Sequence, residues 1–131
     1  MSDLEVVCKA LDFLGLSYIK NGKCRMWDDK SITAPIVITL PDFDIAVKPK
    51  GEILELVADS MAYEYLHRLP IVSKFIKPYE YVTQKRFSEI LQQSYNVVKA
   101  VAVAAEMGHS IYIGMPDESG VISAQVVTGH A

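Results

Sequence analysis

Metal-binding and disulfide-forming residues are scarce in this sequence. Its 131 residues include only two cysteines, Cys8 and Cys24, without the Cys-x-x-Cys spacing of zinc sites, and three scattered histidines. Asp28 and Asp29 are adjacent, but no third candidate ligand lies near them in sequence, which is typical of a solvated loop. The sequence therefore predicts no metal site, no cofactor and a fold that does not depend on disulfides.

Catalytic signatures are also missing. Gly15, Gly22, Gly114 and Gly120 are isolated and end predicted elements, so neither a phosphate-binding loop nor a dinucleotide fingerprint is present. No serine lies in a nucleophile-elbow motif. Cys24 could work with a distant histidine only if folding brought the two together, and its place in a predicted strand favours a structural role. We expect no catalytic residues, and an enzyme is the less favoured class.

An excess of basic charge is absent as well. Thirteen Lys and Arg oppose sixteen Asp and Glu, giving a net charge of -3, whereas a general nucleic-acid coat protein would be basic. The charge is uneven along the chain. Residues 1–66 carry seven basic and eleven acidic side chains, and residues 67–131 carry six and five. The basic residues of the second part gather between Arg68 and Arg86.

Neither a long apolar run nor a secretory signal is visible. The nearest apolar stretch, residues 97–105, contains Lys99 and is shorter than the roughly 20 residues of a membrane span. The first residues are acidic, whereas a signal peptide begins with basic ones. We expect a cytoplasmic protein with free thiols and no membrane partner.

What the chain does have is apolar side chains. Half of its residues are hydrophobic and 22% are charged, which indicates a folded rather than a disordered protein. The length is that of one domain, residues 1–131. Ser2 and Glu5 fit a capping box, and an apolar stripe at helical spacing then runs to Gly15. This pattern predicts a first helix with Cys8 on its buried side.

A second and longer helix is predicted from the cap Thr83 to the terminating Gly108. Its residues 97–105 are apolar nearly all round, which indicates burial on more than one side. A short helix is expected over 61–69, stopped by Pro70.

The remaining segments favour strands. Asn21-Gly22 is the strongest two-residue hairpin signal, so strands are expected at 17–20 and 23–27. Alternation over 43–48 predicts Ile45 and Val47 inside, with Asp44 and Ala46 outside. Further strands are expected at 32–40, 53–58, 111–115 and 121–127. This order predicts an α+β fold: an antiparallel sheet of about five to six strands with two main helices packed on one face.

The segment 68–87 mixes basic and aromatic residues. Such a mixture suits single-stranded nucleic acid or a phosphorylated ligand, through phosphate contacts and stacking. The favoured alternative is that the aromatic rings hold a proline-containing connector on the core while the lysines keep it soluble. The candidates are Arg68, Tyr79, Tyr81, Lys85 and Arg86.

Three further residues are candidates for binding a ligand or partner. Tyr63 and Tyr95 are expected on helices, where tyrosines mostly pack with the hydroxyl group hydrogen-bonded. Asp59 precedes the short helix. A cleft lined by these three residues and Arg86 would indicate a small-ligand site.

The segments 43–47, 54–59 and 93–108 are similar to the hypothetical chloroplast reading frame thirty-five family, small proteins of plastids, cyanobacteria and other bacteria. The resemblance singles out Asp59 and Tyr95. It implies a fold rather than a reaction, because the biochemical function of that family is not established. The family pattern has tryptophan and glycine after the Val-Ala-Asp stretch, whereas this chain has Ser60, Met61 and Ala62, so a ligand role of this turn does not carry over.

These observations favour a binding or adaptor protein that acts through a protein partner or through self-association. A binder of small or phosphorylated metabolites is the first alternative, and single-stranded nucleic-acid binding through 68–87 is the second. One sheet and two helices cannot bury all of these apolar side chains, because a helix that packs on a sheet buries only one stripe of its own surface. We therefore expect an apolar surface, around the long helix or on the outer sheet face, that another chain covers.

Overall fold

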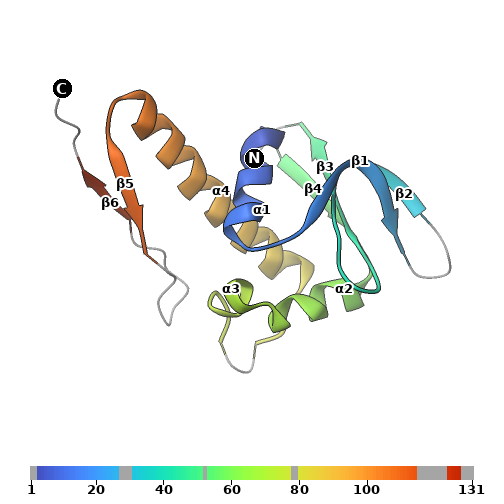
Figure 1. Cartoon of the computed structure of the whole chain (residues 1–131). Coiled ribbons are helices and arrows are strands. Elements are labelled where there is room, and N and C mark those ends of the chain that lie inside the picture. Colours follow the sequence, from blue (N-terminus) through green and yellow to red (C-terminus); the bar gives the residue numbers. More distant parts are fainter. Residues whose placement is uncertain (1–2, 27–30, 52, 78–79, 115–123, 128–131) are drawn as a thin grey trace.

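The computed structural model describes residues 3–26, 31–51, 53–77, 80–114 and 124–127. Its elements are shown in Figure 1. In chain order they are α1 (Leu4–Phe13), β1 (Tyr18–Arg25), β2 (Ser31–Ile38), β3 (Ile45–Lys50), β4 (Ile53–Val57), α2 (Ser60–Tyr65), the 3₁₀ helix η2 (Leu66–Arg68), α3 (Pro70–Ser73), α4 (Gln84–Glu106), β5 (Ser110–Ile113) and β6 (Ala124–Val127).

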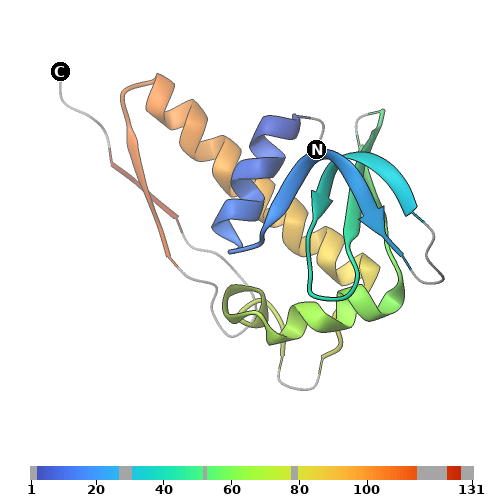
Figure 2. The same ribbon diagram turned by 45° about the vertical axis from the view of Figure 1, so that its right-hand side comes forward.

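The main sheet is an antiparallel meander in the order β1-β2-β3-β4, so the predicted α+β class and antiparallel sheet are confirmed. The predicted single sheet of five to six strands is not found, because β5 and β6 pair with each other in a separate two-stranded sheet. The cause is the length of α4, whose 23 residues span about 34 Å. Figure 2 shows that α4 carries the chain away from the meander before β5 begins.

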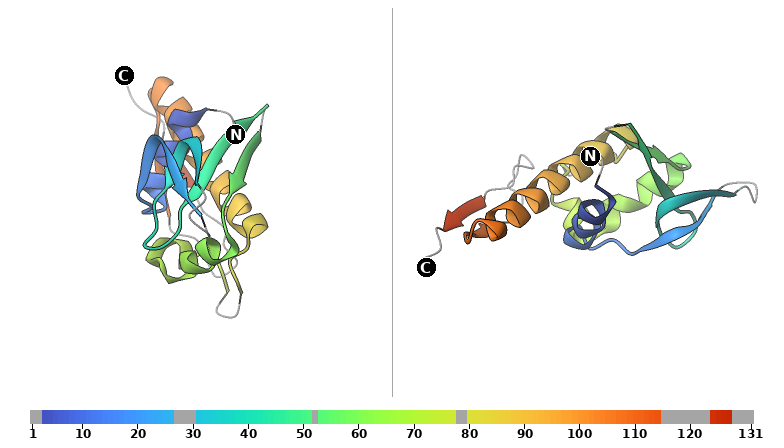
Figure 3. Two further views of the ribbon diagram at one scale, coloured as in Figure 1. Left: turned by 90° about the vertical axis from the view of Figure 1, so that its right-hand side faces the viewer. Right: turned by 90° about the horizontal axis from the view of Figure 1, so that it is seen from above.

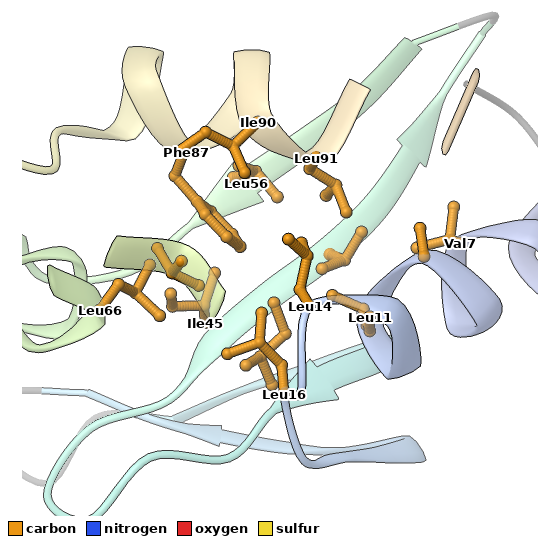
Figure 4. Close-up of a cluster of buried hydrophobic side chains, with 14 of the residues drawn as sticks. Val7, Leu11, Leu14, Leu16, Ile45, Leu56, Leu66, Phe87, Ile90 and Leu91 are labelled. Carbon is orange, nitrogen blue, oxygen red and sulfur yellow. The ribbon is translucent and has the colours of Figure 1, made fainter. Parts of the chain in front are cut away.

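The main core lies between the helices and the meander. Buried side chains of α1 and α4 meet those of β2, β3 and β4, and Leu66 joins them from the α2–η2 segment (Figure 4). The prediction of two main helices packed on one face is therefore not confirmed in that form, since the short α2–η2 segment is part of the same layer. Val98 is the last α4 residue that packs against this core.

A smaller apolar cluster consists of Cys24, Ala34, Val37 and Ala46. Met26, Ile32 and Val57 pack against it, and the strands β1 and β2 that carry most of it are curved (Figure 3). The alternation rule placed Ala46 and Asp44 outside, yet Ala46 is 0% and Asp44 2% exposed. Asp44 is buried because Arg25 neutralises its charge, as described below.

The predicted hairpin at Asn21-Gly22 is wrong, because β1 runs straight through both residues. The ladder with β2 pairs residues 20 with 36 and 22 with 34, so it continues on both sides of Asn21. Asn21 adopts a φ of 51° and falls opposite Pro35, which has no N–H to donate. The tertiary pairing thus converts a turn signal into a local distortion within one strand.

The helix ends follow local capping rules. The N-cap of α1 is Asp3 rather than the predicted Ser2, which lies outside the described residues; the Asp3 carboxylate accepts hydrogen bonds from the amides of Glu5 and Val6. Thr83 caps α4 as predicted, by accepting from the Arg86 amide. Gly108, with a φ of 76°, ends α4 as predicted.

One ion pair holds the end of β1 to the start of β3. The buried Asp44 carboxylate accepts hydrogen bonds from the Arg25 backbone amide at 2.8 Å, from its Nε at 2.9 Å and from its Nη2 at 2.8 Å. The same guanidinium donates to the carbonyl of Leu40. Burial alone would raise the pKa of Asp44, but the hydrogen bonds from Arg25 outweigh it and hold this pKa below its ordinary value.

Replacing Asp44 with asparagine should lower the free energy of unfolding by about 2 kcal/mol, because charge-assisted hydrogen bonds to a buried group are lost. The depressed pKa means that the native protein gains stability above the ordinary aspartate pKa of about 4 and loses it as pH falls through the folded-state value. Urea unfolding at several pH values should show that D44N lacks this acid-side loss. The exposed Asp42→Asn is the control, and an equal effect there would contradict the role of Asp44.

The left-handed glycine after α4 gives a second test. The amide of Gly108 donates to Ala105 at 3.1 Å and that of His109 to Ala104 at 2.8 Å, which is a Schellman motif. Gly108→Ala should cost about 1 kcal/mol from its φ alone, since an added Cβ would meet nothing within 4 Å. Gly108→Asn should cost less in thermal unfolding. Equal stability of all three proteins would contradict this account.

Candidate functional site

The connector before α4 is fastened by Arg86. Its Nε donates to Glu80 at 2.8 Å, its Nη1 to Glu89 at 3.3 Å and its Nη2 to the carbonyl of Phe75. Glu80 also accepts from the Lys77 amide at 3.0 Å. This backbone hydrogen bond, together with the charge of Arg86, holds the pKa of Glu80 below its ordinary value despite some burial. Arg86 therefore binds the connector to the start of α4 through these hydrogen bonds.

The other candidates of the connector do not converge on one site. Tyr81 is 81% exposed and Lys85 is exposed as well. Tyr79 lies outside the described residues. Arg68 is exposed at the end of η2, where its guanidinium carbon lies 5.7 Å from the centre of the Tyr65 ring.

Tyr63 and Tyr95 are core residues, 3% and 4% exposed. The Tyr63 ring lies 6.2 Å from that of Phe87, and burial raises the pKa of Tyr63 to about 12. The Tyr95 hydroxyl oxygen accepts a hydrogen bond from the Asp3 amide at 3.3 Å. Both rings thus pack in the core, but the Tyr63 hydroxyl group is buried without a hydrogen-bond partner among the described residues, contrary to the expectation for tyrosines on helices.

Asp59 is partly buried and is the N-cap residue of α2. Together with the two core tyrosines and Arg86 it was expected to line a ligand cleft. The cavities found among the described residues are lined by other side chains. None of these four residues is in the lining of the cavities described here.

A cavity of about 260 Å³ lies between the 40–43 loop and the α2–η2 segment. Arg68 is the only one of the sequence-predicted candidates in its lining, and Met61, 43% exposed, contributes an apolar wall. Asp42 and Glu64 add acidic groups beside His67. The mixed signs of charge select no particular class of ligand.

A second hollow lies on the last turns of α4. It has a volume of about 480 Å³, is almost wholly apolar, and is called the distal groove below. Val103 is 48% and Met107 66% exposed. Its lining residues are Asn96, Lys99, Ala100, Val103, Ala104, Met107 and His109.

The position of the distal groove follows from the helix lengths. The 10 residues of α1 span about 15 Å, less than half of the length of α4. Beyond Val98, the last α4 residue packed on the main core, the helix projects past α1, and β5 of the separate hairpin lies beside its end (Figure 1). His109 Nδ1 is buried there without a hydrogen-bond partner among the described residues.

The sequence signal for this groove was the run 97–105, apolar nearly all round. The run predicted that α4 would be covered on several sides, whereas Val103 and Ala105 are exposed. The signal missed Met107, because that residue follows the run. No residue of the groove was among the predicted site residues.

The described residues offer little for catalysis. Burial, with the charge of Asp44 adding to it, raises the pKa of the Cys24 thiol to about 11, so it stays protonated. Both cysteines are free and buried, and Cys8 lies on the buried side of α1 as predicted. Within the described residues, no three His, Cys, Asp or Glu side chains are placed to hold a metal ion. Among the described residues, no helix is long and apolar enough to cross a membrane.

Arg86→Ala should lower the free energy of unfolding by about 1–2 kcal/mol, since a partly buried guanidinium loses its hydrogen bonds to the connector. The neighbouring exposed Lys85→Ala is the matched control and should change stability by less than about 0.5 kcal/mol. Urea unfolding measures both. An R86A protein as stable as K85A would show that the guanidinium is free to bind something else.

Comparison with protein-family models, curated proteins and solved structures finds no match to this chain, so its resemblance to the reading frame thirty-five family stays a prediction.

Proposed function

We propose that this protein is a non-enzymatic, cytoplasmic protein-binding module that acts through the distal groove. The observation that carries the proposal is the exposure of Val103 and Met107 at the end of α4, beyond the last residue that packs on the main core. Exposed apolar surface of this kind marks interaction sites in folded proteins.

The character of the distal groove favours a protein over a small molecule. Small-ligand sites combine an enclosed apolar cavity with a few convergent polar groups that orient the ligand. The distal groove is open, and its polar groups, Asn96, Lys99 and His109, lie apart along its length. Such a surface suits the apolar face of another helix, which needs little polar recognition.

The β5–β6 hairpin supports the same proposal. Two paired strands alone are at best marginally stable in water. Within the described residues, α4 is the main element outside the hairpin that β5 contacts. A partner bound in the distal groove would lie beside the hairpin and stabilise it.

The small-ligand alternative has one observation in its favour, the cavity that contains Arg68 and Met61. Nucleic-acid binding is the weaker alternative, because Arg86 is paired with Glu80 and Glu89 instead of being available for phosphates.

Two exposed methionines provide matched variants. Met107→Lys places a charge in the distal groove, and Met61→Lys places one in the other cavity. Native mass spectrometry of the protein purified from its own cells should show a complex of fixed stoichiometry. We expect M107K to lose this complex and M61K to retain it.

Three outcomes would contradict the proposal. Loss of the complex in M61K alone would move the binding site to the cavity beside Arg68. A small molecule retained by the wild-type protein and lost in M61K would favour the ligand alternative. A wild-type protein that carries no partner and does not associate with itself would remove the proposed function altogether.

A further inference from the structure

The distal groove has the spacing of one strand of a coiled coil. Asn96, Ala100, Val103 and Met107 follow one another at intervals of four, three and four residues. This alternation is that of the d and a positions in a heptad. These residues form one seam on α4, and the apolar part of the seam is open to contact.

Charged residues flank this seam in a regular way. Lys99 directly precedes Ala100, and Glu106 directly precedes Met107, so both occupy the heptad position called g. Both side chains are exposed. The seam thus carries one positive and one negative charge, exactly one heptad apart in sequence and on the same side.

We propose that the seam of α4 pairs with the same seam of a second copy of this chain, antiparallel about a two-fold axis. This inference rests on the proposed function and names its partner. In this register Ala100 meets the second copy's Val103, and Asn96 meets the second copy's Met107. A two-fold axis makes each contact occur twice, as in other self-complementary dimers.

Charge complementarity selects this partner and this direction. In the antiparallel register the g positions of the two helices lie on the same side, so Lys99 lies beside the second copy's Glu106, two residues along the helix from the level position, and the symmetry creates a second identical pair. In a parallel dimer the g position faces the e position, so Lys99 would face the second copy's Ala104 and gain no ion pair. A partner of uniform charge would satisfy only one of the two residues.

The polar groups on the seam tolerate this arrangement. The Asn96 side chain already accepts a hydrogen bond from Gln92 Nε2 at 2.9 Å, so it keeps a partner when Met107 of the second copy covers it. The Lys99 ammonium lies 5.9 Å from the centre of the Tyr95 ring and remains exposed. No buried charge is therefore created.

The size of the seam sets the strength of the dimer. From residue 96 to residue 107 the helix rises about 17 Å, and so short a contact buries less than the about 800 Å² per partner of a standard interface. A reversible dimer that forms with increasing concentration is the expected state.

Charge reversal tests the register. Lys99→Glu places two acidic residues opposite each other, and Glu106→Lys places two basic ones, so each variant alone should dimerise about tenfold more weakly than wild type. A mixture of the two variants restores both opposite-charge pairs and should form a heterodimer of near wild-type strength. The double variant K99E/E106K should do the same. Sedimentation equilibrium at low salt measures each association constant.

A separate measurement checks that the variants still fold. Both replaced residues are exposed, so neither replacement should disturb the core. Circular dichroism should give thermal midpoints close to wild type for all variants. The Lys9→Glu variant, which reverses an exposed charge on α1, should dimerise like wild type. If the mixture of K99E and E106K stays monomeric while wild type dimerises, the antiparallel register is overturned.

The outcome also separates this inference from the proposed function. A wild-type protein that is monomeric at all concentrations, but holds another protein in an M107K-sensitive complex, overturns self-pairing and leaves the binding module in place. A protein that neither dimerises nor holds a partner overturns both.

Discussion

The mismatch in length between α1 and α4 is the constraint on which the rest of the structure depends. The core needs helical cover only as far as the meander extends, and α1, the α2–η2 segment and the part of α4 up to Val98 supply it. The last turns of α4 do not pack against that core. The separate hairpin, the distal groove and the exposed seam all follow from that projection, and so does the small number of strands in the main sheet.

Sequence patterns predicted the features that depend on local interactions. The apolar stripe of the first helix, the cap at Thr83 and the terminating Gly108 are set by neighbouring residues, and all three are confirmed. Features that depend on distant partners were missed. Nothing near Asn21 shows that Pro35 will lie opposite it, and nothing near Asp44 shows that Arg25 will enclose its carboxylate. Both partners come from other strands, and only the tertiary fold brings them together.

The candidate site divides in the same way. The apolar run 97–105 located the groove correctly, because excess hydrophobicity is a property of the local sequence. The apolar excess also predicted an uncovered surface, either around the long helix or on the outer sheet face, but the choice between the two depends on where the core ends. The mixture of basic and aromatic residues in the connector predicted a binding segment. Arg86, however, pairs with Glu80, which lies six residues before it, and the composition does not show this pairing. Tyr63 and Tyr95 were interesting as residue types, and their rings turn out to fill the core.

The contact between the two ends of the main core has a consequence for synthesis of the chain. The Asp3 amide meets the hydroxyl group of Tyr95, 92 residues later, and the apolar face of α1 is covered by α4. The meander pairs neighbouring strands and can form early. Because contacts between distant residues close only after the intervening chain exists, α1 gains its contacts with α4 only once all of the chain between them has been made. Until then, the part of α1 that α4 covers in the folded protein stays exposed.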